Sequence, residues 1–88
     1  MVLSQNYEIV DIAEETLAVP VGEMAEKSKD VFSFSRAGGF LLNQLKKPKT
    51  EEEMIDCIIK EFDVDFETAK SDVQAFISAI RSYGLIVD

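Results

Sequence analysis

The sequence predicts an α+β fold in which a three-stranded antiparallel sheet is followed by three helices. Short runs rich in Ile, Val and Thr precede residue 35, and apolar residues at helical spacing dominate after it. Strands and helices that come in runs, not in alternation, are typical of a sheet packed against a small helical bundle. Eighty-eight residues are too few for two cores, so we expect one domain over residues 1–88.

Three segments have the composition and alternation of strands. Residues 7–12 and 16–21 are separated by a polar break, and residues 31–34 form a brief third strand with Phe32 and Phe34 on one face. Pro20 cannot donate a ladder hydrogen bond, so it belongs near a strand end or on a side that faces no neighbour. The charged segment 22–30 is predicted to be a solvated loop.

Three capped helices are predicted after the strands. Ser35 is placed to cap the first, which ends before Pro48. Thr50-x-x-Glu53 is a capping box for the second helix. Asp65 is placed to cap the third.

Glycines mark two further features. Gly84 predicts a left-handed stop for the third helix, after which the apolar tail 85–87 is expected to pack on the core. The pair Gly38–Gly39 costs a helix about 1 kcal/mol per residue relative to alanine. Close packing of the first helix against the sheet is the explanation we favour for that pair.

Charge and hydropathy restrict the partners and the location. The net charge is −8, which disfavours nucleic acid, although residues 31–49 carry four bases and no acid. No apolar run is long enough to span a membrane. The single Cys57 cannot form an internal disulfide, and no signal peptide is evident, so we expect a cytoplasmic protein.

The residue inventory disfavours catalysis. The chain has no histidine and one cysteine, Cys57, which sits among apolar helical neighbours as a small hydrophobe. No spacing of ligands suggests a metal. Gly38–Gly39 lacks the longer glycine-rich loop and the following Lys-Ser or Lys-Thr of a phosphate cradle. Lys46–Lys49 could bind an anion, but a solvated turn is the interpretation we favour. We therefore expect no enzyme activity and no cofactor.

The predicted third strand, residues 31–34, is the feature that suggests a function. An edge strand without proline or a bulge leaves backbone donors and acceptors open to another chain. The edge could capture a peptide by β-augmentation, or it could be harmless because it is short. Composition alone favours the harmless edge over peptide capture.

From Val31 to its end the sequence resembles the PqqD family, stand-alone recognition elements for the leader segments of ribosomally made, enzymatically modified peptides. The motifs that carry the resemblance follow in this order: Phe34-Ser35-Arg36-Ala37-Gly38-Gly39 with Phe40-Leu41-Leu42, Pro48-Lys49-Thr50-Glu51-Glu52-Glu53, Glu61-Phe62-Asp63-Val64, then Ala69, Asp72-Val73, Phe76 and Gly84-Leu85-Ile86. Three departures from the family pattern are Ser35 for the usual Asn, Arg36 for an acid, and Leu42 near the position of a customary Trp.

The resemblance implies a winged helix-turn-helix-like unit in which a leader peptide adds as a strand beside the third strand. The backbone edge would be Val31, Phe32, Ser33 and Phe34. The opposite wall, on the third helix, would be Lys70, Val73, Phe76, Ile77 and Ile80. The positive charge of residues 31–49 adds the hypothesis that Arg36 and the three lysines attract an acidic leader. The bound peptide would be presented to a modifying enzyme, often a radical S-adenosylmethionine protein, as in PQQ biosynthesis, and the iron–sulfur cluster would belong to that partner.

The sequence leaves two other functions open. A winged-helix regulator of DNA would need a basic recognition helix, yet the third helix contains Asp65, Glu67 and Asp72 against Lys70 and Arg81. A structural module is the other alternative, in which the open edge pairs with a second copy to form a C2 homodimer.

Overall fold

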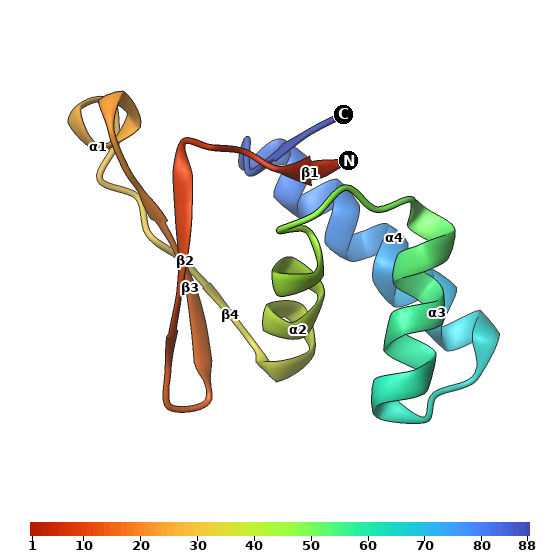
Figure 1. Ribbon diagram of the computed structural model, residues 1–88. Helices are drawn as coiled ribbons and strands as arrows, with labels where there is room; N and C mark the ends of the chain where they lie inside the picture. Colours follow the sequence, from red (N-terminus) through yellow and green to blue (C-terminus); the bar gives the residue numbers. More distant parts are fainter.

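A three-stranded antiparallel sheet and three longer helices make up most of the computed structural model, which describes residues 1–88 (Figure 1). The sheet has the order β2–β3–β4 and contains β2 (Tyr7–Ile12), β3 (Glu15–Pro20) and β4 (Phe32–Phe34). The helices α2 (Arg36–Gln44), α3 (Glu51–Phe62) and α4 (Phe66–Ser82) all lie on one side of it. The predicted α+β class and the order of elements are confirmed.

The hairpin between β2 and β3 closes through a two-residue turn. Ile12 pairs with Glu15, which leaves Ala13 and Glu14 as the loop, and Ala13 adopts a positive φ of 56°. Two-residue hairpin loops favour positive φ because their twist then matches that of the strands. Pro20 is the last residue of β3, a strand end that suits a residue with no N–H to donate.

The prediction of a loop over residues 22–30 is wrong in part, because α1 (Glu23–Lys27) forms there. The helix is five residues long and follows Gly22, whose φ is +59°. The Ser28 amide closes it by donating to the Met24 carbonyl at 2.8 Å. Met24 packs against the core, and this contact stabilises a turn that local sequence alone does not favour.

The caps of the three longer helices agree with the predictions. The Ser35 hydroxyl accepts from the Gly38 amide, and the Asp65 carboxylate accepts from the Thr68 amide. Thr50 and Glu53 form both hydrogen bonds of a capping box. Each cap satisfies helix N–H groups that have no partner inside the helix, so these boundaries are set by local sequence.

The core lies between the sheet and the helices and continues between the helices. Tyr7 and Ala18 contribute from the sheet, and the remaining members come from α2 to α4, the C-cap of α2 and the tail. The buried apolar residues are Tyr7, Ala18, Leu41, Leu42, Leu45, Met54, Ile55, Ile58, Ala69, Val73, Ile77, Ile80 and Leu85. None of the helices is both long and apolar enough to cross a membrane.

A second, two-stranded sheet joins the ends of the chain. In it β1 (Val2–Leu3) pairs antiparallel with β5 (Ile86–Val87). Neither strand was predicted, although the apolar tail was expected to pack on the core. Leu85 does so and is fully buried.

Candidate functional site

The strand β4 forms one edge of the three-stranded sheet, because β3 is its only neighbour. The register pairs Phe34 with Thr16, Ser33 with Leu17, and Phe32 with Ala18. An edge strand carries a row of backbone groups that no other strand satisfies. The prediction of a brief strand within residues 31–34 is confirmed, and β4 is an edge.

The direction of these backbone groups follows from one hydrogen bond at the open end of the hairpin. The Val21 N–H donates to the Asn6 carbonyl at 2.9 Å, so the amide of Val21 faces β2. Backbone groups alternate in direction along an antiparallel strand, so the even-numbered residues of β3 face β4. The two phenylalanines of β4 therefore bond to β3, while the N–H and C=O of Ser33, and of Val31 before it, point away from the sheet.

The inner face of β4 contacts α4 through two pairs of aromatic rings. Phe32 stacks on Tyr83 with ring centroids 4.5 Å apart and planes 13° apart. Phe34 meets Phe76 edge to face at 6.0 Å. We call these four rings the aromatic seam. It lies beside the free edge of β4 and forms an apolar wall next to its open backbone groups.

Tyr83 was not among the predicted site residues. It follows Phe76 by seven residues, which is about two turns of an α-helix, so both rings lie on the same side of α4. The sequence contained this signal, but the tyrosine was interpreted only as the end of the helix. It is 44 % exposed despite its contact with Phe32.

Three of the predicted wall residues belong to the core. Val73 and Ile80 are fully buried and Ile77 is 6 % exposed. Phe76 is half-buried and reaches β4. The structure therefore brings Phe76 to the edge strand and places Val73, Ile77 and Ile80 behind the surface of α4.

Lys70 lies on another side of α4. At about 100° per residue it is rotated by roughly 120° from Phe76 around the helix axis. It lines a hollow of about 320 Å³ between α3 and α4, together with Glu51, Glu52, Ile55, Asp56 and Phe66. The structure does not bring Lys70 to β4.

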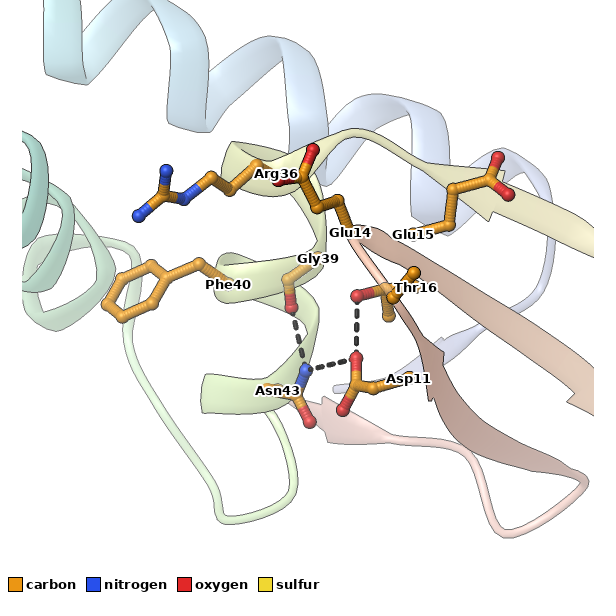
Figure 2. Close-up of a pocket in the computed structure, with 9 residues that line it drawn as sticks. Asp11, Glu14, Glu15, Thr16, Arg36, Gly39, Phe40 and Asn43 are labelled. Carbon is orange, nitrogen blue, oxygen red and sulfur yellow. Dashed lines mark hydrogen bonds between the residues drawn. The ribbon is translucent and has the colours of Figure 1, made fainter.

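The cations of residues 31–49 do not gather at the edge strand either. Lys49 exchanges two backbone hydrogen bonds with Met1, and Lys46 lines a hollow beside β1. Arg36, in the first turn of α2, lines the hollow beside the hairpin, and its guanidinium points away from the hairpin (Figure 2). Attraction of an acidic leader by this segment therefore has no support from the positions of its charges.

The hollow beside the hairpin has a volume of about 420 Å³ and lies between the hairpin tip and α2 (Figure 2). Its polar wall is linked by hydrogen bonds: Thr16 donates to Asp11 at 2.7 Å, and Asn43 donates to the Gly39 carbonyl at 3.0 Å. Glu14 and Glu15 make the rim acidic. The Asn43 side chain also donates to Asp11 at 3.5 Å, and this bond joins α2 to the sheet. The polar groups here are therefore explained by packing.

The titratable groups show no cluster suited to metal binding or catalysis. No three His, Cys, Asp or Glu side chains lie where they could hold a metal ion together. The pKa is lowered for Glu53 by its hydrogen bond from the Thr50 amide, and for Asp65 by hydrogen bonds from Thr68. Both carboxylates are helix caps, so their shifts have a structural cause.

Two solved structures have the same fold over nearly their whole length. The structure described as TbiB1 in complex with the TbiA(beta) leader peptide matches with a TM-score of 0.80 and 23 % identity, covering 100 % of both chains. Lasso peptide synthetase B1 complexed with the leader peptide matches with a TM-score of 0.78 and 10 % identity, over 98 % of this chain and 95 % of that one. No curated protein matches. The chain thus has the α+β fold of these two proteins.

The family follows from the sequence. The profile of PqqD, coenzyme PQQ synthesis protein D, matches residues 14–86, which include β3, β4 and all the helices. The chain belongs to the PqqD family, and the resemblance found in its motifs is confirmed.

Proposed function

We propose that this protein binds the leader segment of a ribosomally synthesised precursor peptide and presents the remainder to a modifying enzyme. The observation that carries the proposal is the free backbone edge of β4, at Val31 and Ser33, beside the aromatic seam. Membership of the PqqD family supports it. The two solved structures of the same fold are each described with a leader peptide bound.

The leader would add as a strand on the open side of β4. Backbone hydrogen bonds to Val31 and Ser33 would hold it, and every second side chain would point toward the aromatic seam. The edge is short, so backbone bonds alone give little affinity and apolar contacts must contribute the rest. We assign these contacts to Phe76 and Tyr83.

The other predicted site residues take different roles in this proposal. Val73, Ile77 and Ile80 support the wall from the core, because they are already buried without a peptide. Arg36 and Lys70 lie in hollows away from β4, so we place them outside the peptide contact.

The chemistry of modification would belong to the partner enzyme. Three or four cysteines usually hold an iron–sulfur cluster, and this chain has one, so a radical S-adenosylmethionine partner would bring its own cluster. The protein itself would be a binding domain over residues 1–88 and not an enzyme. A reducing cytoplasm suits the single free thiol of Cys57.

Replacing Ser33 with proline tests the edge directly. Ser33→Pro removes the one amide of β4 that points outward, and proline is tolerated on edge strands because no internal ladder bond is lost. We expect affinity for a synthetic leader peptide from the co-encoded precursor to fall at least tenfold in isothermal titration calorimetry. The Ser33→Ala control keeps the amide and loses only the hydroxyl bond to Glu15, so it should bind like wild type.

Equal leader affinity in Ser33→Pro and Ser33→Ala would refute strand addition at β4. Sedimentation velocity on the same proteins tests the competing role, in which the edge pairs with a second copy. A wild-type dimer that Ser33→Pro dissociates would support self-pairing and contradict our proposal.

A further inference from the structure

The sheet has a second face, turned away from α2, α3 and α4 (Figure 1). Apolar residues alternate onto this face along the strands. Tyr7, Thr16 and Ala18 are buried toward the helices, so the alternate residues of each strand point outward. We call this surface the outer face. Its apolar members are Val10, Ile12, Leu17, Val19 and Val31.

The apolar residues of the outer face are contiguous and take no part in the core. Val10 pairs directly with Leu17 across the hairpin, and Val19 and Ile12 flank this pair on the two strands. All five are absent from the core cluster and from the residues packed against it. Ile12 is 56 % and Val31 50 % exposed. Val10, Leu17 and Val19 between them are half-buried, so the apolar surface is contiguous and partly exposed, and a surface of this kind marks an interaction site.

The charges on this face decide which occupant suits it. Glu8 and Glu15 share the outer face, Glu14 lies at the hairpin tip, and the three strands contain no lysine or arginine. Two copies packed through this face would bring like charges together, which disfavours a homodimer. The complementary partner has an apolar surface bordered by lysine or arginine.

The outer face is continuous with the leader-binding edge. Ser33, whose backbone points toward the proposed leader strand, directs its hydroxyl to the outer face and donates to Glu15 at 3.1 Å. The side chain of Val31 lies on the same face. A protein seated on the outer face would therefore lie directly beside a bound leader.

We propose that the outer face docks the enzyme that modifies the precursor peptide, through an apolar patch on that enzyme bordered by basic residues. This inference rests on the proposed function, because it takes the modifying enzyme as the partner that must be brought close to the bound leader. Docking on a surface separate from the leader contacts would let one small protein hold peptide and enzyme at the same time.

The test measures binding by biolayer interferometry. Each protein encoded in the same gene cluster is purified and its binding to the full chain is measured singly. Val10→Arg and Ile12→Arg place a cation on the outer face without touching β4 or the core. We expect at least tenfold weaker binding of the modifying enzyme to either variant, with leader affinity unchanged in calorimetry. Phe66→Arg, which alters an equally exposed apolar residue on α4, should bind the enzyme like wild type.

Charge reversal tests the acidic border. Glu8→Lys should weaken enzyme binding several-fold, whereas the matched control Glu61→Lys, at the end of α3, should not. Enzyme binding that is equal in wild type and the outer-face variants, or absent in all proteins, would overturn the docking proposal. Leader affinity is measured in a separate experiment. The effect of Ser33→Pro on that affinity therefore tests the proposed function, whatever the result for enzyme binding.

Discussion

Gly39 decides how closely α2 approaches the sheet. A Cβ at this position would overlap the side chain of Thr16 and lie 2.7 Å from its Cβ. Thr16 is buried and donates to Asp11 at 2.7 Å, so it cannot rotate away without losing that bond. At Gly38 an added Cβ would meet only ordinary contacts with Phe34. Close packing thus explains the second glycine of the pair and not the first.

Replacing Gly39 or Gly38 with alanine should therefore have opposite effects on the stability of the protein. Gly39→Ala should destabilise the protein by about 1–3 kcal/mol, because overpacking forces the helix or Thr16 to shift. Gly38→Ala should stabilise it by about 0.5–1 kcal/mol, since alanine is the better helix former and the space is available. Urea unfolding of both variants measures the difference. Equal free energies of unfolding would contradict the role of Gly39.

At the scale of elements, the helix starts are held by side-chain caps that also respond to pH. The Asp65 carboxylate accepts from the Thr68 amide at 2.8 Å, and hydrogen bonding from Thr68 lowers the pKa of Asp65 below its ordinary value of 3.8. A carboxylate whose pKa is lowered on folding stabilises the folded state above its ordinary pKa. This contribution is lost as the pH falls through the folded-state pKa.

Replacing Asp65 with asparagine separates the cap from its charge. Asparagine is as good a capping residue as aspartate but does not titrate. We expect Asp65→Asn to lose less stability than wild type as the pH is lowered from about 5 to about 2, in urea unfolding at each pH. Parallel curves for the two proteins would show that Asp65 does not contribute to acid unfolding.

Local chemistry explains which elements could be predicted from the sequence. The caps at Ser35, Thr50 and Asp65 depend on residues three positions apart, so their pattern is visible in the sequence. The helix α1 depends on a contact of Met24 with the core, and β1 pairs with β5 across nearly the whole chain. Neither contact has a local signal, so neither element was predicted.

The candidate site was likewise predicted only where the sequence carries a local signal. Alternation located the phenylalanines of β4, because a strand separates its two faces strictly. On α4 the family resemblance assigned Val73, Ile77 and Ile80 to the wall, although they belong to the buried apolar stripe, and it did not include Tyr83. Helical spacing identifies the buried stripe but not the flank that meets a neighbouring strand, which only the tertiary arrangement defines.

At the scale of the whole molecule, the two ends of the chain are fastened to the same part of the core. The Leu3 N–H donates to the Leu45 carbonyl and the Ser4 N–H to the Leu85 carbonyl, each at 2.8 Å. Leu85 follows Gly84, whose φ of +76° turns the chain back onto the core after α4. The residue thus links the N-terminal strand, the last helix and the tail.

Leu85→Ala should reveal how much of the stability depends on this link. Leu85 is fully buried, so removing its side chain leaves a cavity and should cost about 2–5 kcal/mol. Val87 lies two residues further along the same tail but is 54 % exposed, so Val87→Ala should change stability by less than about 0.5 kcal/mol. Urea unfolding compares the two variants. A domain of this size has a total stability of roughly 5–15 kcal/mol, so Leu85→Ala should lower the denaturation midpoint markedly. Equal midpoints for Leu85→Ala and Val87→Ala would mean that the tail is not part of the cooperative core.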